Sequence, residues 1–181
     1  MEELEIPYNV IPINIGKGEQ FDPEFLKISP NNKIPAMVDQ EGPRGKPYAV
    51  FETGAMMMYL AEKTGQLMPI DMTARYQVVQ WLMFQMGGVG PMFGQYSHFT
   101  TYAPETFDYS VARYTRECLR LYGVMDRRLA ENPYLAGDRY TIADIACYAW
   151  VYAYKRRGFN IEEQPNVLRW IEAIGARPAV Q

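Results

Sequence analysis

The sequence has few of the residues that hold metal ions or carry protein-based redox chemistry. Among its 181 residues are two cysteines, Cys118 and Cys147, and one histidine, His98. The cysteines lie far apart and form no CxxC motif, so neither a zinc site nor a protein dithiol is predicted. Any redox chemistry would therefore need a thiol from another molecule. We expect both cysteines to pack as small apolar residues.

Long apolar runs and blocks of like charge are also missing. No apolar run reaches the ~18 residues of a membrane-spanning helix, and the start, MEELEIPYNV, lacks the basic and apolar regions of a signal peptide. The net charge of −3 is spread over both signs, which gives no support for nucleic-acid or membrane-surface binding. We therefore expect a cytoplasmic protein with neither kind of partner. With 48% hydrophobic residues, the chain can bury one large core or two small ones.

The first part of the chain has the pattern of a mixed α/β unit. Three segments have the composition of strands, namely 8–13 (YNVIPI), 35–39 and 47–51, and the last two flank a short Gly/Pro-rich connection. DPEFLKISP predicts a short helix that begins after Asp22. TGAMMMYLAEKTG predicts a longer helix that ends at Gly65.

The remainder of the chain has helical periodicity throughout. A long helix is expected to begin near Asp71 or Thr73 and to be interrupted at GGVGP, residues 87–91. Further helices are predicted over residues 108–131, 142–157 and 166–175. The change in composition at residues 66–72 predicts two domains, 1–68 and 69–181.

The motif YTIADIACYAW, residues 140–150, contains a carboxylate that has two interpretations. Thr141 is followed three residues later by Asp144, which is the spacing of a capping box at a helix N-terminus. The alternative is a catalytic carboxylate at Asp144. The apolar surroundings favour the cap.

Two further motifs place polar groups where a ligand could bind. FETGA, residues 51–55, puts Glu52 and Thr53 at a strand-to-helix junction, where free amides suit a ligand carboxylate, although Thr53 could be a plain N-cap. NNKIPAMVD places Ile34-Pro35 just before a strand, a pattern compatible with a cis turn that leaves the main chain of Ile34 free to pair with a peptide-like ligand. The alternative is an ordinary entry into a strand.

In this order and spacing, NKIPAMVD, FETGA and YTIAD resemble the cytosolic glutathione transferase family over essentially the whole chain. Longer stretches, GKGEQF, SPNNKIP, QWLMFQMGGVGPMFGQ and ARYTRECLRLYGVMDRRL, are similar to the bacterial Nu-class branch with its disulfide-bond oxidoreductases, close to the fungal Ure2-like proteins. The resemblance implies a thioredoxin-like α/β domain over residues 1–68, an all-α domain over 69–181, and a homodimer.

The resemblance also implies a function and its co-substrate. Glutathione would act as co-substrate without any metal, and the expected activity is glutathione-dependent reduction of a small disulfide. Two alternatives stay open, conjugation of glutathione to electrophiles and a non-catalytic role in binding glutathione for regulation or interaction.

Site residues follow from the resemblance position by position. The loop of Gln20 and the segment Lys33-Ile34-Pro35 would hold the glycyl and cysteinyl parts of glutathione, while Glu52 and Thr53 would take its γ-glutamyl end. Two further residues, Gln95 and Arg113, match positions that line a second glutathione or the dimer cleft, although each could be an ordinary surface residue. The aromatic residues between Phe93 and Tyr109 could wall an apolar pocket or belong to a dimer core.

The resemblance further implies that the family's first strand, with the residue that activates the glutathione sulfur, would lie upstream of Met1. The chain would then begin inside the following helix, at MEELEIPY, and end soon after RPAVQ, where relatives continue. The catalytic residue is accordingly unknown, and the activity of this chain would depend on it.

Overall fold

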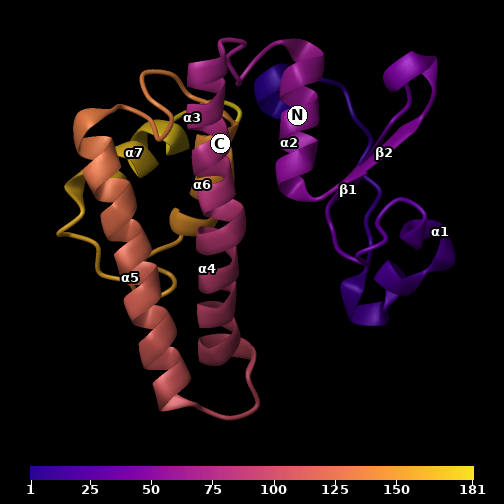
Figure 1. Ribbon diagram of the computed structural model, residues 1–181. Coiled ribbons are helices and arrows are strands. Elements are labelled where there is room, and N and C mark those ends of the chain that lie inside the picture. Colours follow the sequence, from indigo (N-terminus) through magenta and orange to yellow (C-terminus); the bar gives the residue numbers. More distant parts are fainter. The chain divides into compact units, whose positions relative to one another are not determined.

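The computed structural model describes residues 1–181 (Figure 1). It divides into two compact units, Met1–Gln66 and Leu67–Gln181.

The first unit is a small α/β domain. Strands β1 (Ala36–Asp39) and β2 (Tyr48–Phe51) pair antiparallel, with Ala36 opposite Phe51. Helix α2 (Thr53–Thr64) packs beside both strands (Figure 1), and Ala61 on this helix is 1% exposed. The other elements are the short helix α1 (Pro23–Leu26) and the 3-10 turns Glu2–Leu4, Ile15–Lys17, Glu19–Phe21 and Pro43–Gly45.

The boundaries of these elements follow from the chemistry of their ends. Asp22 caps α1 by accepting a hydrogen bond of 2.8 Å from the Glu24 amide. Gly65 ends α2 with φ at 68°, in the left-handed region that glycine adopts without steric cost. The predictions of this hairpin and of both helices are confirmed.

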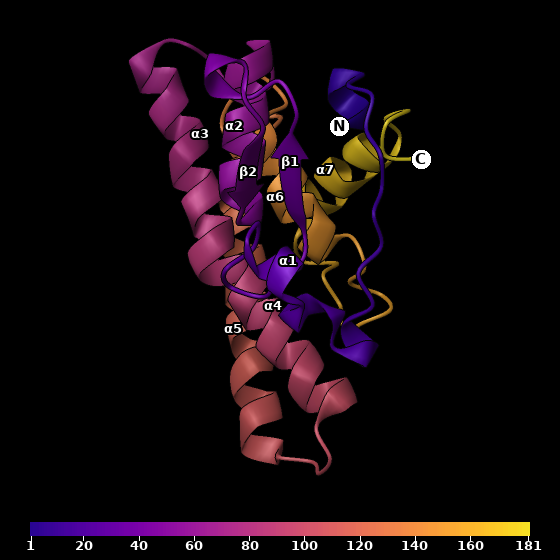
Figure 2. The same cartoon turned by 90° about the vertical axis from the view of Figure 1, so that its right-hand side faces the viewer.

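The predicted strand over residues 8–13 is wrong. This segment is an unpaired coil, which Figure 2 shows as the long indigo segment leading from the N-terminal turn toward α1. Val10 and Ile11 are 76% and 81% exposed. An apolar, β-branched sequence favours an extended backbone, but a strand also needs a neighbour for its main-chain groups, and the sheet consists of β1 and β2.

The second unit is all-helical. Its helices are α3 (Met72–Phe84), α4 (Gly90–Ser97), α5 (Asp108–Glu131), α6 (Ile142–Val151) and α7 (Pro165–Gly175), with the π-helical turns Gln85–Val89 and His98–Tyr102 before and after α4. Figures 1 and 2 show α3 and α4 as one continuous rod, with α5 beside α4.

The predicted interruption at residues 87–91 is therefore a change of helical pitch. The Gly90 amide donates to the Gln85 carbonyl, which is the i+5 spacing of a π turn. Pro91, which has no amide hydrogen, then occupies the first turn of α4, where a donor is not required. The helix α6 is also shorter than predicted. It ends at Val151, where the Arg157 side chain donates to the Trp150 carbonyl and satisfies one of the last carbonyls of the helix.

The main hydrophobic core lies within the helical unit. Its centre is formed by Phe93, Tyr122, Met125 and Trp170, each fully buried. The cysteines behave as the sequence predicts, because both are buried and unpaired. Burial raises the pKa of Cys118 to about 12 and also raises the pKa of Cys147.

Asp144 is confirmed as a capping residue. The Thr141 side chain accepts from the Ala143 amide, while the Asp144 carboxylate accepts from the Thr141 amide at 3.0 Å. The same carboxylate also accepts from the Leu135 amide and from the Trp170 indole, each at 2.9 Å. Asp144 therefore joins the start of α6 to the preceding loop and to α7.

None of the helices combines the length and the apolarity that a membrane span requires. No group of three or more His, Cys, Asp or Glu side chains is arranged to hold a metal ion.

Candidate functional site

The loop between α1 and β1 is held by a buried serine. Ser29 is 1% exposed, and its hydroxyl donates to the Lys33 carbonyl at 2.8 Å. Its own carbonyl accepts from the Asn32 amide at 2.9 Å. These two bonds close the loop over residues 29–33. Because Ser29 is buried, water does not compete for them, and they fix the shape of the loop.

The next residues present free main-chain groups. Ile34-Pro35 is a cis peptide bond, as the sequence suggested. No hydrogen bond within the protein uses the amide or the carbonyl of Ile34, and the residue is 47% exposed. Lys33 is exposed, and its ammonium group has no partner in the protein. The segment therefore offers a cation and an unpaired peptide unit to an extended ligand.

Glu52 occupies the junction between β2 and α2 in an unusual backbone conformation. Its φ is 69° and its ψ is 116°, a region that residues other than glycine seldom adopt. It is the N-cap of α2, yet its side chain makes no capping bond. The first helical bond runs from the Met56 amide to the Glu52 carbonyl, so the amides of residues 53–55 have no helical partner.

The structure brings these two motifs together. The side-chain amide of Asn31 donates to Oε1 of Glu52 at 3.1 Å, across 21 residues of sequence. The NNKIP loop and the FET junction are thus neighbours at the N-terminus of α2. Sequence reasoning did not single out Asn31, because its polar side chain is ordinary in a loop until its partner is known.

This arrangement suits the zwitterionic end of an amino acid. A ligand carboxylate would find the free amides and the positive end of the α2 dipole. A ligand ammonium group would find the Glu52 carboxylate, which forms no ion pair within the protein. Gln20 is a further candidate, because its Oε1 is buried without a hydrogen-bond partner.

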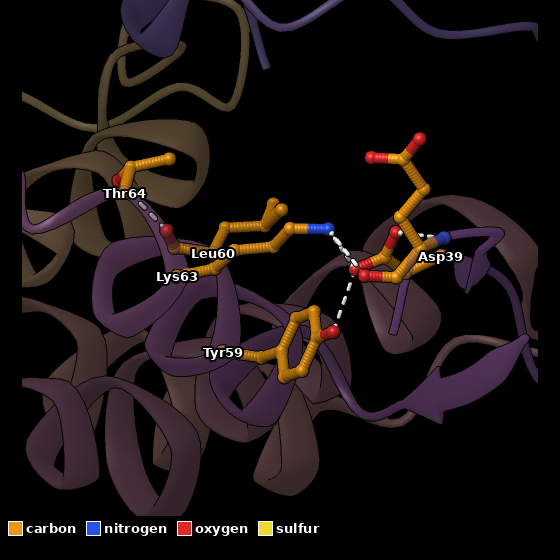
Figure 3. Close-up of polar contacts among 6 residues, drawn as sticks. Asp39, Tyr59, Leu60, Lys63 and Thr64 are labelled. Atoms are coloured by element: carbon orange, nitrogen blue, oxygen red, sulfur yellow. Dashed lines mark hydrogen bonds and ion pairs between the residues drawn. The ribbon is translucent and has the colours of Figure 1, made fainter. Parts of the chain in front are cut away.

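A second polar cluster links β1 to α2 (Figure 3). The Asp39 carboxylate accepts from the Tyr59 hydroxyl at 2.6 Å and from the Lys63 ammonium group. The Lys63 bond, together with the Tyr59 bond, lowers the pKa of Asp39, and the bond to Asp39 raises the pKa of Tyr59 to about 12. The Lys63 ammonium group also donates to the Glu41 carbonyl at 3.0 Å, so the cluster fixes α2 to the end of β1 and to the residues that follow it. The spacing of Tyr59 and Lys63 at i and i+4 was the available sequence signal.

The helical unit holds the other two predicted site residues. Gln95 lies in α4 and Arg113 in the first part of α5, both exposed and on helices that pack together. Neither side chain makes a hydrogen bond in the protein, and the charge of Arg113 helps, after Arg120, to lower the pKa of Glu117 on the same helix. Both stay predictions as ligand-binding residues.

The aromatic residues from Phe93 to Tyr109 have mixed surroundings. Phe93 is fully buried in the core, and the Tyr96 hydroxyl donates to the Arg157 carbonyl at 2.7 Å. Tyr102 and Tyr109 are 75% and 73% exposed. The run is therefore not one continuous wall, and its exposed members are separate from the core.

Comparison with known proteins assigns this architecture to a family. Residues 1–62 match the model described as glutathione S-transferase, N-terminal domain, and residues 90–178 match glutathione S-transferase, C-terminal domain. The chain belongs to the glutathione S-transferase family, with a thioredoxin-like α/β domain followed by a helical domain. The fold class predicted from the sequence is confirmed.

Individual relatives narrow the likeness to one branch. The disulfide-bond oxidoreductase YfcG of Escherichia coli is 48% identical over 180 residues, which cover 99% of this chain and 84% of that protein. A glutathione transferase from Burkholderia graminis, solved with two glutathione molecules per subunit, has a TM-score of 0.92 and 45% identity, over 99% of this chain and 78% of that one. A glutathione transferase from Pseudomonas putida, solved with glutathione disulfide, has a TM-score of 0.92 and 42% identity, over 99% of this chain and 81% of that one. The resemblance to disulfide-bond oxidoreductases is thereby confirmed.

Proposed function

We propose that the protein is a glutathione-dependent disulfide-bond oxidoreductase in which glutathione supplies the redox thiol. The observation that carries this proposal is the hydrogen bond between Asn31 and Glu52, because it brings together the two motifs that we propose as the binding site of a thiol tripeptide. The names of the relatives support the same activity, because YfcG and YghU of Escherichia coli are both disulfide-bond oxidoreductases.

In the proposed complex the tripeptide lies along the first unit. Glu52 and the amides at Thr53 take the γ-glutamyl end, and the main chain of Ile34 before Pro35 pairs with the cysteinyl residue. The two remaining residues, Lys33 and Gln20, take the glycyl part, where an ammonium group suits a carboxylate and an unpaired amide oxygen suits an N–H donor.

The reaction is thiol–disulfide exchange with every redox sulfur outside the protein. A glutathione thiolate attacks one sulfur of the substrate disulfide, forms a mixed disulfide and releases the other sulfur as a thiolate that takes up a proton. A second glutathione thiolate attacks the mixed disulfide at the glutathione sulfur. This step releases the second substrate thiol and yields glutathione disulfide. Cys118 and Cys147 are unsuited to either step, since both are buried with raised pKa values.

We propose further that Gln95 and Arg113 bind the second glutathione, Arg113 through a carboxylate. The Burkholderia graminis relative, with two glutathione molecules per subunit, supports a second site. A cytoplasmic homodimer is proposed as the working form. Exposed apolar side chains on α3, Met72, Tyr76 and Met83, supply surface for such contacts.

The test is a coupled assay with 2-hydroxyethyl disulfide and glutathione, in which glutathione reductase and NADPH report the glutathione disulfide formed. The double variant Cys118→Ala/Cys147→Ala is the control, and it is expected to retain the activity. Binding of glutathione without turnover of any disulfide would point to a non-catalytic role. Faster conjugation of a halonitrobenzene than reduction of disulfides would replace the proposal with conjugation. Loss of activity in the cysteine-free variant, if folded, would contradict the mechanism.

A further inference from the structure

We infer that Asn31 is a positioning residue, which orients the Glu52 carboxylate toward the ammonium group of the γ-glutamyl end of glutathione. This inference rests on the proposed function and extends it. Asn31 itself is not required to touch the ligand. Its role would be to fix one oxygen of Glu52, so that the other oxygen is directed at the ligand.

The geometry of the loop supports this role. Ser29 precedes Asn31 and forms hydrogen bonds with the two residues that follow it. Its carbonyl accepts from the Asn32 amide, and its hydroxyl donates to the Lys33 carbonyl. Asn32, with φ at 49°, adopts the left-handed conformation that asparagine tolerates. Asn31 therefore projects from a short turn that is anchored on a residue 1% exposed to solvent.

Glu52 needs such a partner more than an average surface carboxylate does. Its side chain is exposed and makes no bond to the amides of α2, so the bond from Asn31 is the contact that restricts its rotamers. The donor is a neutral amide rather than a cation. The carboxylate consequently keeps its full charge for a ligand ammonium group, while a lysine or arginine partner would neutralise it.

The predicted consequence is selective for one ligand group. In Asn31→Ala, Glu52 keeps its charge but loses its preferred orientation, and the dissociation constant of glutathione should rise by about three- to tenfold, the range for one hydrogen bond. An analogue that lacks only the γ-glutamyl amino group, glutaryl-cysteinyl-glycine, should be affected less than about twofold, because it does not use Glu52.

The experiment is isothermal titration of glutathione and of this analogue into four proteins, wild type, Asn31→Ala, Glu52→Ala and the double variant. Asn31→Ala should have no further effect once Glu52 is replaced. Asn9→Ala is the matched control, since Asn9 is exposed in the same unit and makes no hydrogen bond. Independently of any ligand, the side-chain amide resonances of Asn31 should shift in Glu52→Ala.

The outcomes separate the two proposals. If the wild type binds glutathione and Asn31→Ala binds it equally well, the positioning role is wrong and the proposed function stands. If Asn31→Ala weakens the binding of glutathione and of the analogue alike, Asn31 supports the fold of the loop, and the positioning role is also wrong. If the wild type binds no glutathione, the proposed function fails, and this inference fails with it.

Discussion

The carboxylate of Asp144 and the indole of Trp170 are joined by a buried hydrogen bond of 2.9 Å between Oδ1 and Nε1. The two residues belong to α6 and α7, and both are fully buried. Because Asp144 also caps α6, a single side chain connects a local helix start with the tertiary packing of another helix. We therefore expect the stability of the helical unit to depend on this bond.

Removing the indole donor should therefore destabilise the protein. Trp170→Phe keeps most of the apolar volume but leaves one oxygen of Asp144 with a donor fewer, and we expect a loss of about 1–3 kcal/mol in the free energy of unfolding. Urea unfolding measures this loss. Trp81→Phe is the control, because the Trp81 indole donates no hydrogen bond and packs edge-on against Phe84. Equal losses in the two variants would show that ring volume, rather than the bond, is responsible.

The cluster around Asp39 predicts a pH dependence. The pKa of Asp39 is lowered from its ordinary 3.8, first by the Lys63 bond, so the stabilisation from the ionised carboxylate is fully present above pH 3.8 and is lost as the pH falls toward the folded-state pKa. Asp39→Asn should expose β1 and α2 to faster amide hydrogen exchange at pH 6, and the difference from wild type should shrink by pH 3.

Comparing wild type and variant at the same pH removes the intrinsic pH dependence of exchange. Asp138→Asn is the matched control, since Asp138 is an exposed residue of the other unit without a hydrogen bond. A difference that grows as the pH falls would contradict the sign of the predicted effect.

Glu52 should account for much of the recognition of glutathione. Glu52→Ala removes the carboxylate at the junction between β2 and α2, and we expect glutathione binding to weaken by about 1.5–3 kcal/mol, the range for a charged hydrogen bond. Isothermal titration provides the dissociation constants. Glu41→Ala changes the net charge equally on an exposed loop of the same unit and should leave binding unchanged. An unchanged affinity in Glu52→Ala would remove Glu52 from the site.

Arg113 should contribute to the binding of a second glutathione molecule rather than to the binding of the first. In Arg113→Ala we expect binding of glutathione disulfide to weaken by about 1.5–3 kcal/mol while the first glutathione binds as in wild type. Arg116→Ala is the control, because Arg116 is exposed on the same helix three residues away and has no partner. Titrations with both ligands measure the effect. If both arginine variants lose affinity equally, general positive charge on α5 is responsible.

Local chemistry was sufficient to predict many features of the fold. Three such features are the Asp22 cap, the Gly65 stop and the capping box at Thr141 and Asp144. Each depends on residues within four positions of one another, so it can be recognised in a short stretch of sequence. The cis form of Ile34-Pro35 is likewise a property that only an X–Pro bond adopts readily.

Features that depend on a distant partner could not be read in this way. The strand predicted over residues 8–13 has the right composition but no neighbour. Likewise, the sequence identified Glu52 as a candidate but not the asparagine that holds it. The interruption predicted at GGVGP differs for a local reason, since a π turn with an i+5 hydrogen bond continues the helix.

By itself the sequence determined which segments are helical and where most of them begin and end, because these features depend on neighbouring side chains. The candidate contacts to a thiol tripeptide followed from the resemblance to a family. Only the tertiary structure decided that Asn31 donates a hydrogen bond to Glu52. The same holds for the bonds that Asp39 accepts from Tyr59 and Lys63, and for the bond that Asp144 accepts from Trp170. The physical reason is the same in each case. A hydrogen bond needs two groups within about 3 Å, and for groups 20 or more residues apart that distance is set by the packing of whole elements.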